Sequence, residues 1–452
     1  MPEYANAFPR KRFFLDMFTR DISVEDCILD LIDNSIDALI RTRHIALSSL
    51  LRSDGSRATP RQLPKIQFSY SPRAIELVDN CGGIPHGLVR DDVFSFGHTR
   101  GYKPTALGVY GVGLKRALFK LGGHFEMESR AMDGGFRVEL DVDNWAKSDD
   151  KPEDWQIPVT RIPAASTMEK AGTKVRVTRL RSDVRQRLSD PTTESRLDRN
   201  VRQAYTLFLE RYVRLLVQTR EIKPEPLPLT ESSEVTPGSE HFVDDDTGVK
   251  VTLMVSLAPL DRGSQWASER AGWFVFCNGR LVVAADKSDL TGWGTVPTGL
   301  PIWHPKYRGF FGVVFFESGD PLALPWTTTK RGLNRESPIY QRTMPKMVQL
   351  AKPVVRFLNK MYPTDSTDVV DERAIARDIS PVGVSNVAHR RPSPFAVTKR
   401  AARGSKSTVS VQYQATTEEI ERVKKRLGKP TWGANRVGRH VLEHYLDKEC
   451  PQ

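Results

Sequence analysis

The stretch 25-EDCILDLIDNSIDALI-40 predicts a helix with one buried face, because its apolar side chains recur at intervals of three and four residues. Its polar residues are less usual. Asp30, Asn34 and Asp37 lie one turn apart along the same side of that helix, where like charges repel and add nothing to packing. This segment alone leaves two interpretations open: a solvated helix face, or a site where acids and an amide hold a metal ion or a water molecule.

Alternating apolar and polar positions predict strands after this helix. Residues 65–80 predict two short strands joined by a turn, and further strands are predicted at 123–131, 135–143 and 172–180. A helix followed by successive strands predicts an α+β sandwich with helices on one face of the sheet. Residues 192–218 predict a long amphipathic helix after these strands.

A second group of strands is predicted at 249–257, 273–284 and 309–318. The middle segment contains Asn278-Gly279, the strongest short hairpin signal in the chain, because both residues tolerate the positive φ angles of a tight turn. These strands predict a second, smaller domain.

The composition changes after Tyr362. Residues 381–410 contain six Lys and Arg side chains, no acidic residue and few large apolar groups, which predicts a flexible basic linker. Helical periodicity returns at 417–428 and 434–449, which predicts two short helices. Their basic residues either contact DNA or form a solvated face, and the sequence leaves both open.

The chain of 452 residues is long enough for two or three domains. The patterns above divide it into a first domain at 1–190, a second domain at 191–362, a basic flexible linker at 363–415 and a short helical segment at 416–452.

Composition narrows the functional classes. The net charge of +12 and the pI near 9.5 are compatible with nucleic-acid binding, but they describe association and not fold. The chain contains no run of about eighteen apolar residues and no apolar signal-peptide core near its start, so we expect a cytoplasmic protein without a membrane partner. The four cysteines include no CxxC pair, which indicates neither a zinc site nor a disulfide framework.

Three later segments give the acidic helix a chemical context. In 79-DNCGGI-84 an acid precedes two glycines, so a tight turn can bring the backbone close to a ligand. In 108-GVYGVGLKRALFKLGG-123 glycines lead into a helix, where backbone N–H groups can face a phosphate. Gly172-Thr173 opens a predicted strand. Each segment alone is a weak signal, since ordinary turns have similar sequences.

The order of these segments resembles the ATP-binding module of the gyrase, Hsp-type chaperone, histidine kinase and MutL (GHKL) superfamily. The segments that carry the resemblance are 30-DLIDNSIDA-38, 79-DNCGGI-84, 97-GHTRGYKPTALGVYGVGLKRA-117 and 172-GTKV-175. The glycine-rich segment looks most similar to MORC-type and MutL-like members. The resemblance implies a Bergerat-type ATP-binding α/β sandwich, followed by a smaller β-α-β transducer domain and a C-terminal helical tail.

The resemblance also implies ATP and Mg²⁺ as cofactors. Asn34 would bind Mg²⁺ through its side-chain oxygen, Asp79 would accept a hydrogen bond from the adenine amino group, and Thr173 would support that contact. The glycine loop would surround the phosphates, with Lys115 nearby. The implied nucleotide-binding residues are Asn34, Asp37, Asp79, Gly83, Ile84, Gly108, Gly111, Val112, Gly113, Leu114, Lys115 and Thr173.

Two positions depart from the superfamily pattern. Hydrolytic branches carry a glutamate as general base one turn before the Asn, and here this position is Asp30, whose side chain is one methylene shorter. Cys81 stands where many members have the first glycine of their turn. We therefore expect slow hydrolysis and a turn of modified form.

The second domain supplies a further catalytic candidate. The segments 272-GWFVFCNGRLVVA-284 and 325-PWTTTKRGLN-334 resemble the transducer domain of MutL, gyrase and MORC proteins, in which a loop lysine reaches the terminal phosphate. The resemblance nominates Lys330, which would stabilise charge that grows on the phosphate during transfer. A solvated loop lysine is the alternative.

Three functions remain open. An ATPase could act as a switch in which ATP orders the lid at 97–107 and pairs two N-terminal domains into a homodimer, as a clamp on DNA or with a separate effector protein. A nucleotide sensor with negligible turnover could recruit a partner instead. A chaperone-like ATPase is the third.

Overall fold

The computed structural model describes residues 10–51, 62–96, 107–108, 111–147, 152–225, 227, 229–260, 266–361, 379–397 and 414–450. Most of the expected lid, residues 97–106, lies outside these ranges. Two compact units are present. The first contains the two domains up to residue 361 together with residues 379–397, and the second contains residues 414–450.

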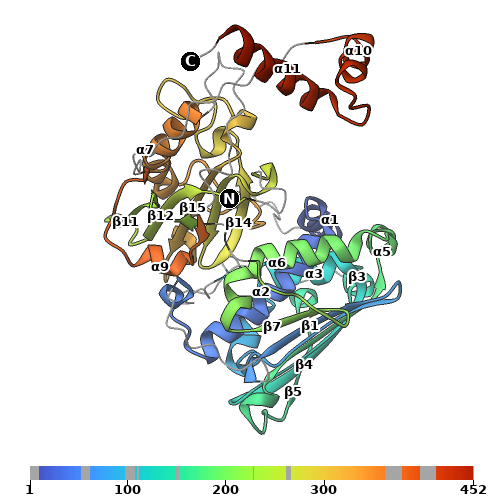
Figure 1. Cartoon of the computed structure of the whole chain (residues 1–452). Coiled ribbons are helices and arrows are strands. Elements are labelled where there is room, and N and C mark those ends of the chain that lie inside the picture. Colours follow the sequence, from blue (N-terminus) through green and yellow to red (C-terminus); the bar gives the residue numbers. More distant parts are fainter. Residues whose placement is uncertain are drawn as a thin grey trace, which may run out of the picture. The chain divides into compact units, whose positions relative to one another are not determined.

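The first domain is built on one eight-stranded sheet with the order β5-β4-β3-β6-β2-β1-β7-β8 (Figure 1). Adjacent strands are antiparallel except β1 and β7, which run parallel. The predicted hairpin over 65–80 and the strands at 123–131, 135–143 and 172–180 are all present, shifted by two residues at most. The strands are β1 (Lys65–Tyr70), β2 (Ala74–Asp79), β3 (Gly122–Ala131), β4 (Gly134–Asp141), β5 (Val159–Ile162), β6 (Gly172–Leu180), β7 (Arg214–Val217) and β8 (Arg220–Glu221).

Helices cover one face of this sheet (Figure 1). The inward side chains of α2, among them Ile28, Ile32 and Ile36, are fully buried. This arrangement is the predicted α+β sandwich, because each layer has one apolar face that must be buried against the other. The helices are α1 (Lys11–Arg20), α2 (Val24–Thr42), α3 (Gly113–Leu121), α4 (Val142–Trp145), α5 (Ser182–Ser189) and α6 (Thr193–Arg211).

The second domain has a five-stranded sheet of order β11-β12-β15-β13-β14. Helix α7 (Pro338–Met361) packs against β12 and β15. The predicted hairpin turns at Asn278 and Gly279, whose φ angles are 48° and 81°, as a tight hairpin requires. The strands are β11 (Gly238–Val243), β12 (Lys250–Leu257), β13 (Gly272–Cys277), β14 (Arg280–Asp286) and β15 (Phe310–Glu317).

The element order of the second domain differs from the expected β-α-β order. In the described part of the domain all five strands precede α7, and only short 3₁₀ turns lie between β14 and β15. The parallel partners β13 and β15 are therefore connected through the β14 hairpin and a largely irregular segment.

The helix expected at 192–218 is too long. α6 ends at Arg211, and Arg214–Val217 form β7 beside β1. Val213, Leu215 and Val217 alternate as buried residues, a period-two pattern that the preceding helical pattern masked. The first sheet thus extends past the expected domain boundary at 190/191.

Part of the expected linker is ordered. Residues 380–397 contain β16 (Ser380–Pro381), α9 (Val384–Ala388) and β17 (Ala396–Val397). Strand β16 pairs with β9 (Thr230–Glu231), and β17 pairs with β10 (Val235–Thr236). Phe395 is buried and lies 6.1 Å from the ring of Phe357. A few apolar residues therefore hold this basic segment on the second domain.

The second unit contains the two predicted terminal helices, α10 (Thr417–Leu427) and α11 (Ala434–Glu449). Thr416 and Glu419 form a reciprocal cap at the start of α10, and Gly428 ends it in the left-handed conformation. Across the described residues, no helix combines the length and the apolar character needed to span a bilayer.

Candidate nucleotide site

Helix α2 carries its acidic residues into the protein interior. Ser23 caps the helix by accepting a hydrogen bond from the Asp26 backbone N–H. Asp30 and Asp33 are each 2% exposed and Asp37 is 5% exposed. The solvated-face interpretation of this helix is therefore wrong. Buried carboxylates need compensating partners, so the surroundings of each one define its chemistry.

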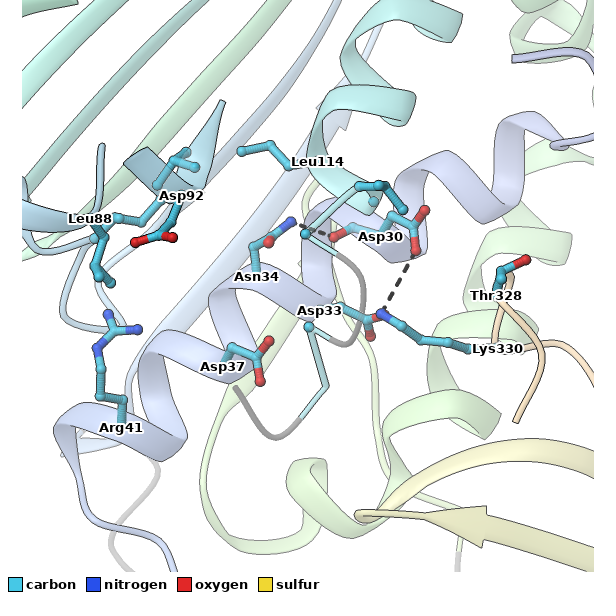
Figure 2. Close-up of a pocket in the computed structure, with 16 residues that line it drawn as sticks. Asp30, Asp33, Asn34, Asp37, Arg41, Leu88, Asp92, Leu114, Thr328 and Lys330 are labelled. Atoms are coloured by element: carbon cyan, nitrogen blue, oxygen red, sulfur yellow. Dashed lines mark hydrogen bonds and ion pairs between the residues drawn. The ribbon is translucent and has the colours of Figure 1, made fainter. Parts of the chain in front are cut away.

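One pocket lies along this side of α2 (Figure 2). The helix contributes Asp30, Asn34 and Asp37, and Lys330 enters from the second domain. Most of the predicted nucleotide-binding residues meet here. The lining residues are Asp30, Asp33, Asn34, Asp37, Arg41, Ile84, Leu88, Asp92, Val93, Gly108, Gly111, Val112, Gly113, Leu114, Thr328 and Lys330.

Asn34 is oriented by its own helix. Its side-chain nitrogen donates a hydrogen bond of 2.6 Å to the Asp30 carbonyl oxygen one turn earlier. Because a carbonyl only accepts, the amide nitrogen must face it, and Oδ1 remains as the acceptor end of the amide. One turn further on, Asp37 accepts a 2.7 Å hydrogen bond from the Leu107 backbone N–H, which ties the start of the glycine loop to α2.

Asp79 lies at the end of β2 and, like Gly83 and Thr173, is not among the residues that line the pocket. Its Oδ1 accepts from the backbone N–H groups of Cys81 (2.9 Å) and Thr173 (3.3 Å), and its Oδ2 accepts from the Ser35 hydroxyl (2.7 Å). Burial raises the pKa of Asp79, although these hydrogen bonds act to lower it. Ser129 extends the network, because its hydroxyl lies 2.9 Å from the Thr173 hydroxyl.

The turn after Asp79 survives with cysteine in place of the first glycine. Gly82 and Gly83 both have positive φ angles, 111° and 66°. A Cβ atom on Gly83 would lie 2.3 Å from the Arg130 carbonyl oxygen, so only glycine suits this close approach. Ile84, which lines the pocket, follows immediately and is fixed by a 2.8 Å hydrogen bond from its N–H to Ser129 Oγ.

Asp30 lies against the first turns of α3. Its Oδ2 forms an ion pair of 3.0 Å with Arg116, and Lys330 Nζ lies 3.9 Å from Oδ1. A Cβ atom on Gly113 would approach the Asp30 carboxyl carbon to 3.1 Å. Burial raises the pKa of Asp30, while Lys330 and Arg116 act to lower it. The group therefore takes up a proton more readily than an exposed aspartate.

Asp33 has a richer set of partners. Lys330 Nζ lies 2.6 Å from its Oδ2, while Arg280 Nε (2.9 Å) and the Tyr205 hydroxyl (2.7 Å) lie beside its Oδ1. Burial acts to raise the pKa of Asp33, but the charges of Arg280 and Lys330 hold it below the ordinary value. Asp30 and Asp33 are thus neighbouring carboxyls whose environments push their pKa values apart.

Lys115 does not reach the pocket lining. Its side chain is 1% exposed, donates a 2.9 Å hydrogen bond to the Val93 carbonyl oxygen and lies over the Phe96 ring. Burial lowers the pKa of Lys115 to about 8. The lysine expected near the phosphates therefore packs against Val93 and Phe96.

Sequence reasoning missed the residues that pair with the buried acids through charge or hydrogen bonds. Arg116 follows the glycine loop, Tyr205 lies on α6, and Arg280 directly follows the β13–β14 turn. Arg280 also donates a 2.7 Å hydrogen bond to the Lys330 carbonyl oxygen, so it holds the lysine loop as well as Asp33. The one available signal was the position of Arg280 next to the strong Asn-Gly hairpin.

The family model described as "Histidine kinase-, DNA gyrase B-, and HSP90-like ATPase" matches residues 22–173. These residues are a GHKL ATPase domain. The match spans α2, the Asp79 turn, the glycine loop and Gly172-Thr173, the segments that build the pocket. No curated protein matches the chain.

The donor set of this GHKL pocket suits a nucleotide with Mg²⁺. Magnesium prefers oxygen ligands, and the amide oxygen of Asn34 lines the pocket among carboxylates. Gly108, Gly111 and Gly113 carry no side chains that would obstruct an approach of phosphates to the backbone at the start of α3. A GHKL ATPase domain implies ATP binding, and the residues present fit the metal that would accompany the nucleotide.

Proposed function

We propose that this protein binds Mg-ATP in the α2 pocket and hydrolyses it slowly. The observation that carries the proposal is the convergence of the Asp30 carboxylate, the Asn34 amide and the Lys330 ammonium on one pocket of a GHKL domain. These three groups can serve as base, metal ligand and phosphate-binding cation.

Each contact then has an assigned role. Asn34 would hold Mg²⁺ through Oδ1, and the ion would supply positive charge beside the phosphates. Asp79 accepts a hydrogen bond from the adenine amino group, supported by Thr173. The backbone N–H groups at Gly111 and Gly113 face the phosphates, where the first turn of α3 favours negative charge.

Hydrolysis requires an oriented water. In our proposal Asp30 accepts a hydrogen bond from that water and takes its proton as the water oxygen attacks the terminal phosphorus. The bond from this phosphorus to the bridging oxygen breaks, which leaves ADP and inorganic phosphate. Lys330 stabilises the charge on the transferred group.

Lys330 would be the moving part of a switch. It lies on Asp33 here, and a terminal phosphate would compete with Asp33 for its ammonium group. Because Lys330 belongs to the second domain, this exchange would transmit the presence of ATP to that domain. The lysine loop would change its partner when ATP binds and return when phosphate leaves.

A nucleotide sensor with negligible turnover is the second candidate. The 3.0 Å ion pair between Asp30 and Arg116 favours it, because a carboxylate already paired with a guanidinium is a weaker base. In that case ATP binding alone would set the state of the protein, and a separate effector would provide its activity.

The two candidates separate in one set of measurements. Nucleotide binding is followed by calorimetry, and turnover by phosphate release, for wild type, Asp30→Ala and Asn34→Ala. Asp133→Ala, an exposed acid in the β3–β4 turn, is the matched control. If the protein hydrolyses ATP as proposed, Asp30→Ala should still bind the nucleotide but lose turnover. Asn34→Ala should lose Mg-dependent nucleotide binding. If wild type binds nucleotide without hydrolysing it, the sensor function is supported. If neither variant loses binding or turnover, both candidate functions are contradicted.

We further infer that ATP pairs two first domains. Phe13 and Met17 lie one turn apart on α1 and are 63% and 56% exposed, an apolar pair that a second copy could cover. Phe13→Glu with Met17→Glu should leave a folded monomer in light scattering when a non-hydrolysable ATP analogue is present. Dimers of this double variant would contradict the inference.

A further inference from the structure

The two terminal helices separate their charges by position. Between Arg422 and Leu442 the chain has seven Lys and Arg residues and no Asp or Glu. The turn between α10 and α11 lies inside this segment, so the basic residues gather near the turn. The acids lie at the other end of both helices, at Glu418, Glu419, Glu421, Glu443, Asp447 and Glu449.

Three of the basic residues share one face of α10. Arg422, Lys425 and Arg426 follow the three- and four-residue spacing of a helix face and are exposed. They line a groove between the helices, with His440 and His444 on the α11 side. Like charges at this spacing repel each other, so this face gains stability when a polyanion neutralises it.

These side chains lack the acidic partners that some other surface arginines of the chain have. On the first domain Arg137, Arg179 and Arg181 each form an ion pair with an acid. Within the described residues, Arg422 and Arg426 form no ion pair, although Lys424 between them pairs with Glu421. In the described structure Arg422, Lys425 and Arg426 are therefore cations without an ion-pair partner, although Glu419 lines the same groove.

The first turns of α11 present a second polar surface. Asn435, Arg436 and Arg439 are exposed, and asparagine and arginine are the residue types that pair with adenine and guanine edges. The Arg436 guanidinium lies 4.5 Å from the Trp432 ring, and the ring lies 5.5 Å from His440. The turn thus packs against α11 and orients Arg436.

We propose that α10 and α11 form a binding site for duplex DNA. The N-terminal half of α11 enters the major groove with Asn435, Arg436 and Arg439, and the basic face of α10 contacts the phosphates. The major groove of B-form DNA admits an α-helix, whereas the deep, narrow groove of A-form RNA does not, so duplex DNA is the occupant. This site is independent of the nucleotide pocket.

The test uses the full chain, a fluorescein-labelled DNA duplex and fluorescence anisotropy across a range of salt concentrations, without nucleotide. Wild type is compared with a variant carrying Arg422→Gln, Lys425→Gln and Arg426→Gln. Lys448→Gln, at the acidic end of α11, is the matched loss of one exposed positive charge. All these side chains are exposed, and circular dichroism checks that each variant is folded.

We expect the triple variant to bind more weakly and to lower the slope of log affinity against log salt by about 3, since each phosphate contact contributes about 0.9. Lys448→Gln should bind as wild type does. Arg439→Ala should reduce the differences in affinity among duplexes of different sequence. An unchanged salt slope in the triple variant would overturn the proposal, and so would equal affinity of wild type for duplex RNA.

The result does not depend on ATP turnover. Asn34→Ala should bind the duplex as wild type does, so a failed ATPase assay leaves the DNA measurement interpretable. A loss of DNA affinity in Asn34→Ala equal to that of the triple variant would contradict an independent site.

Discussion

Lys330 of the second domain places its ammonium group 2.6 Å from Asp33 on α2 of the first domain. The contact joins residues 297 positions apart in the chain. Asp30, one turn earlier, lies 3.9 Å from the same ammonium group, so the lysine lies near two of the carboxyl groups that line the pocket. Because the Lys330 ammonium group is held by carboxylates without nucleotide, it is well placed to move from them to a phosphate.

Lys330→Ala should lower ATP turnover by about 10²–10³-fold, the usual loss when one preorganised charge-stabilising donor is removed. Nucleotide binding should change much less, because Asn34 and the glycine loop remain. Phosphate release and calorimetric titration measure the two properties. Lys174→Ala, at an exposed pair with Glu76, is the control. Equal losses of turnover in both variants would contradict the role of Lys330.

Arg280→Ala should destabilise the protein by about 3–5 kcal/mol, because it removes one partner of a buried ion pair and leaves Asp33 less compensated. Urea unfolding measures the free energy. Arg335→Ala breaks the exposed pair with Asp289 and should change the free energy of unfolding much less, because solvent screens this pair. Similar values for the two variants would show that Asp33 does not depend on Arg280.

Gly113→Ala should reduce turnover more than it reduces folding stability. Its Cβ would lie 3.1–3.3 Å from the carboxyl atoms of Asp30, so the carboxylate must move. Gly87→Ala is the matched control, since nothing lies within 4 Å of its added Cβ. Turnover and thermal unfolding are compared for both variants. If Gly113→Ala hydrolyses ATP as fast as Gly87→Ala, the position of Asp30 is not critical.

Turnover should increase with pH through the pKa of Asp30, because a general base acts in its deprotonated form. Burial raises this pKa, so the acidic limb of the pH–turnover profile should lie above the ordinary aspartate pKa of about 3.9. Arg116→Met removes a charge that lowers the pKa and should move the limb to higher pH. The control is Arg137→Met on the sheet surface. A limb that stays in place or moves to lower pH would exclude Asp30 as the titrating group.

The sequence by itself determined the local elements and the order of the motifs. The apolar spacing around Asp30 and Asn34 defined α2, and Asn278-Gly279 defined the hairpin, because these signals depend on residues close in the chain. The resemblance carried by the acidic helix, the Asp79 turn and the glycine loop indicated the GHKL domain that the family model identifies.

Only the tertiary structure decided which charges meet. Asp33, Tyr205 and Arg280 come from α2, α6 and β14, and their sequence neighbours give no sign of the shared contact. Whether an acid on α2 is solvated or buried depends on which segments pack over it. The spacing of residues along the helix does not reveal these segments. The same reason explains β7. Residues 214–217 come directly after a helical pattern that masks their own, and the edge of β1 offers their backbone a parallel partner that determines their conformation.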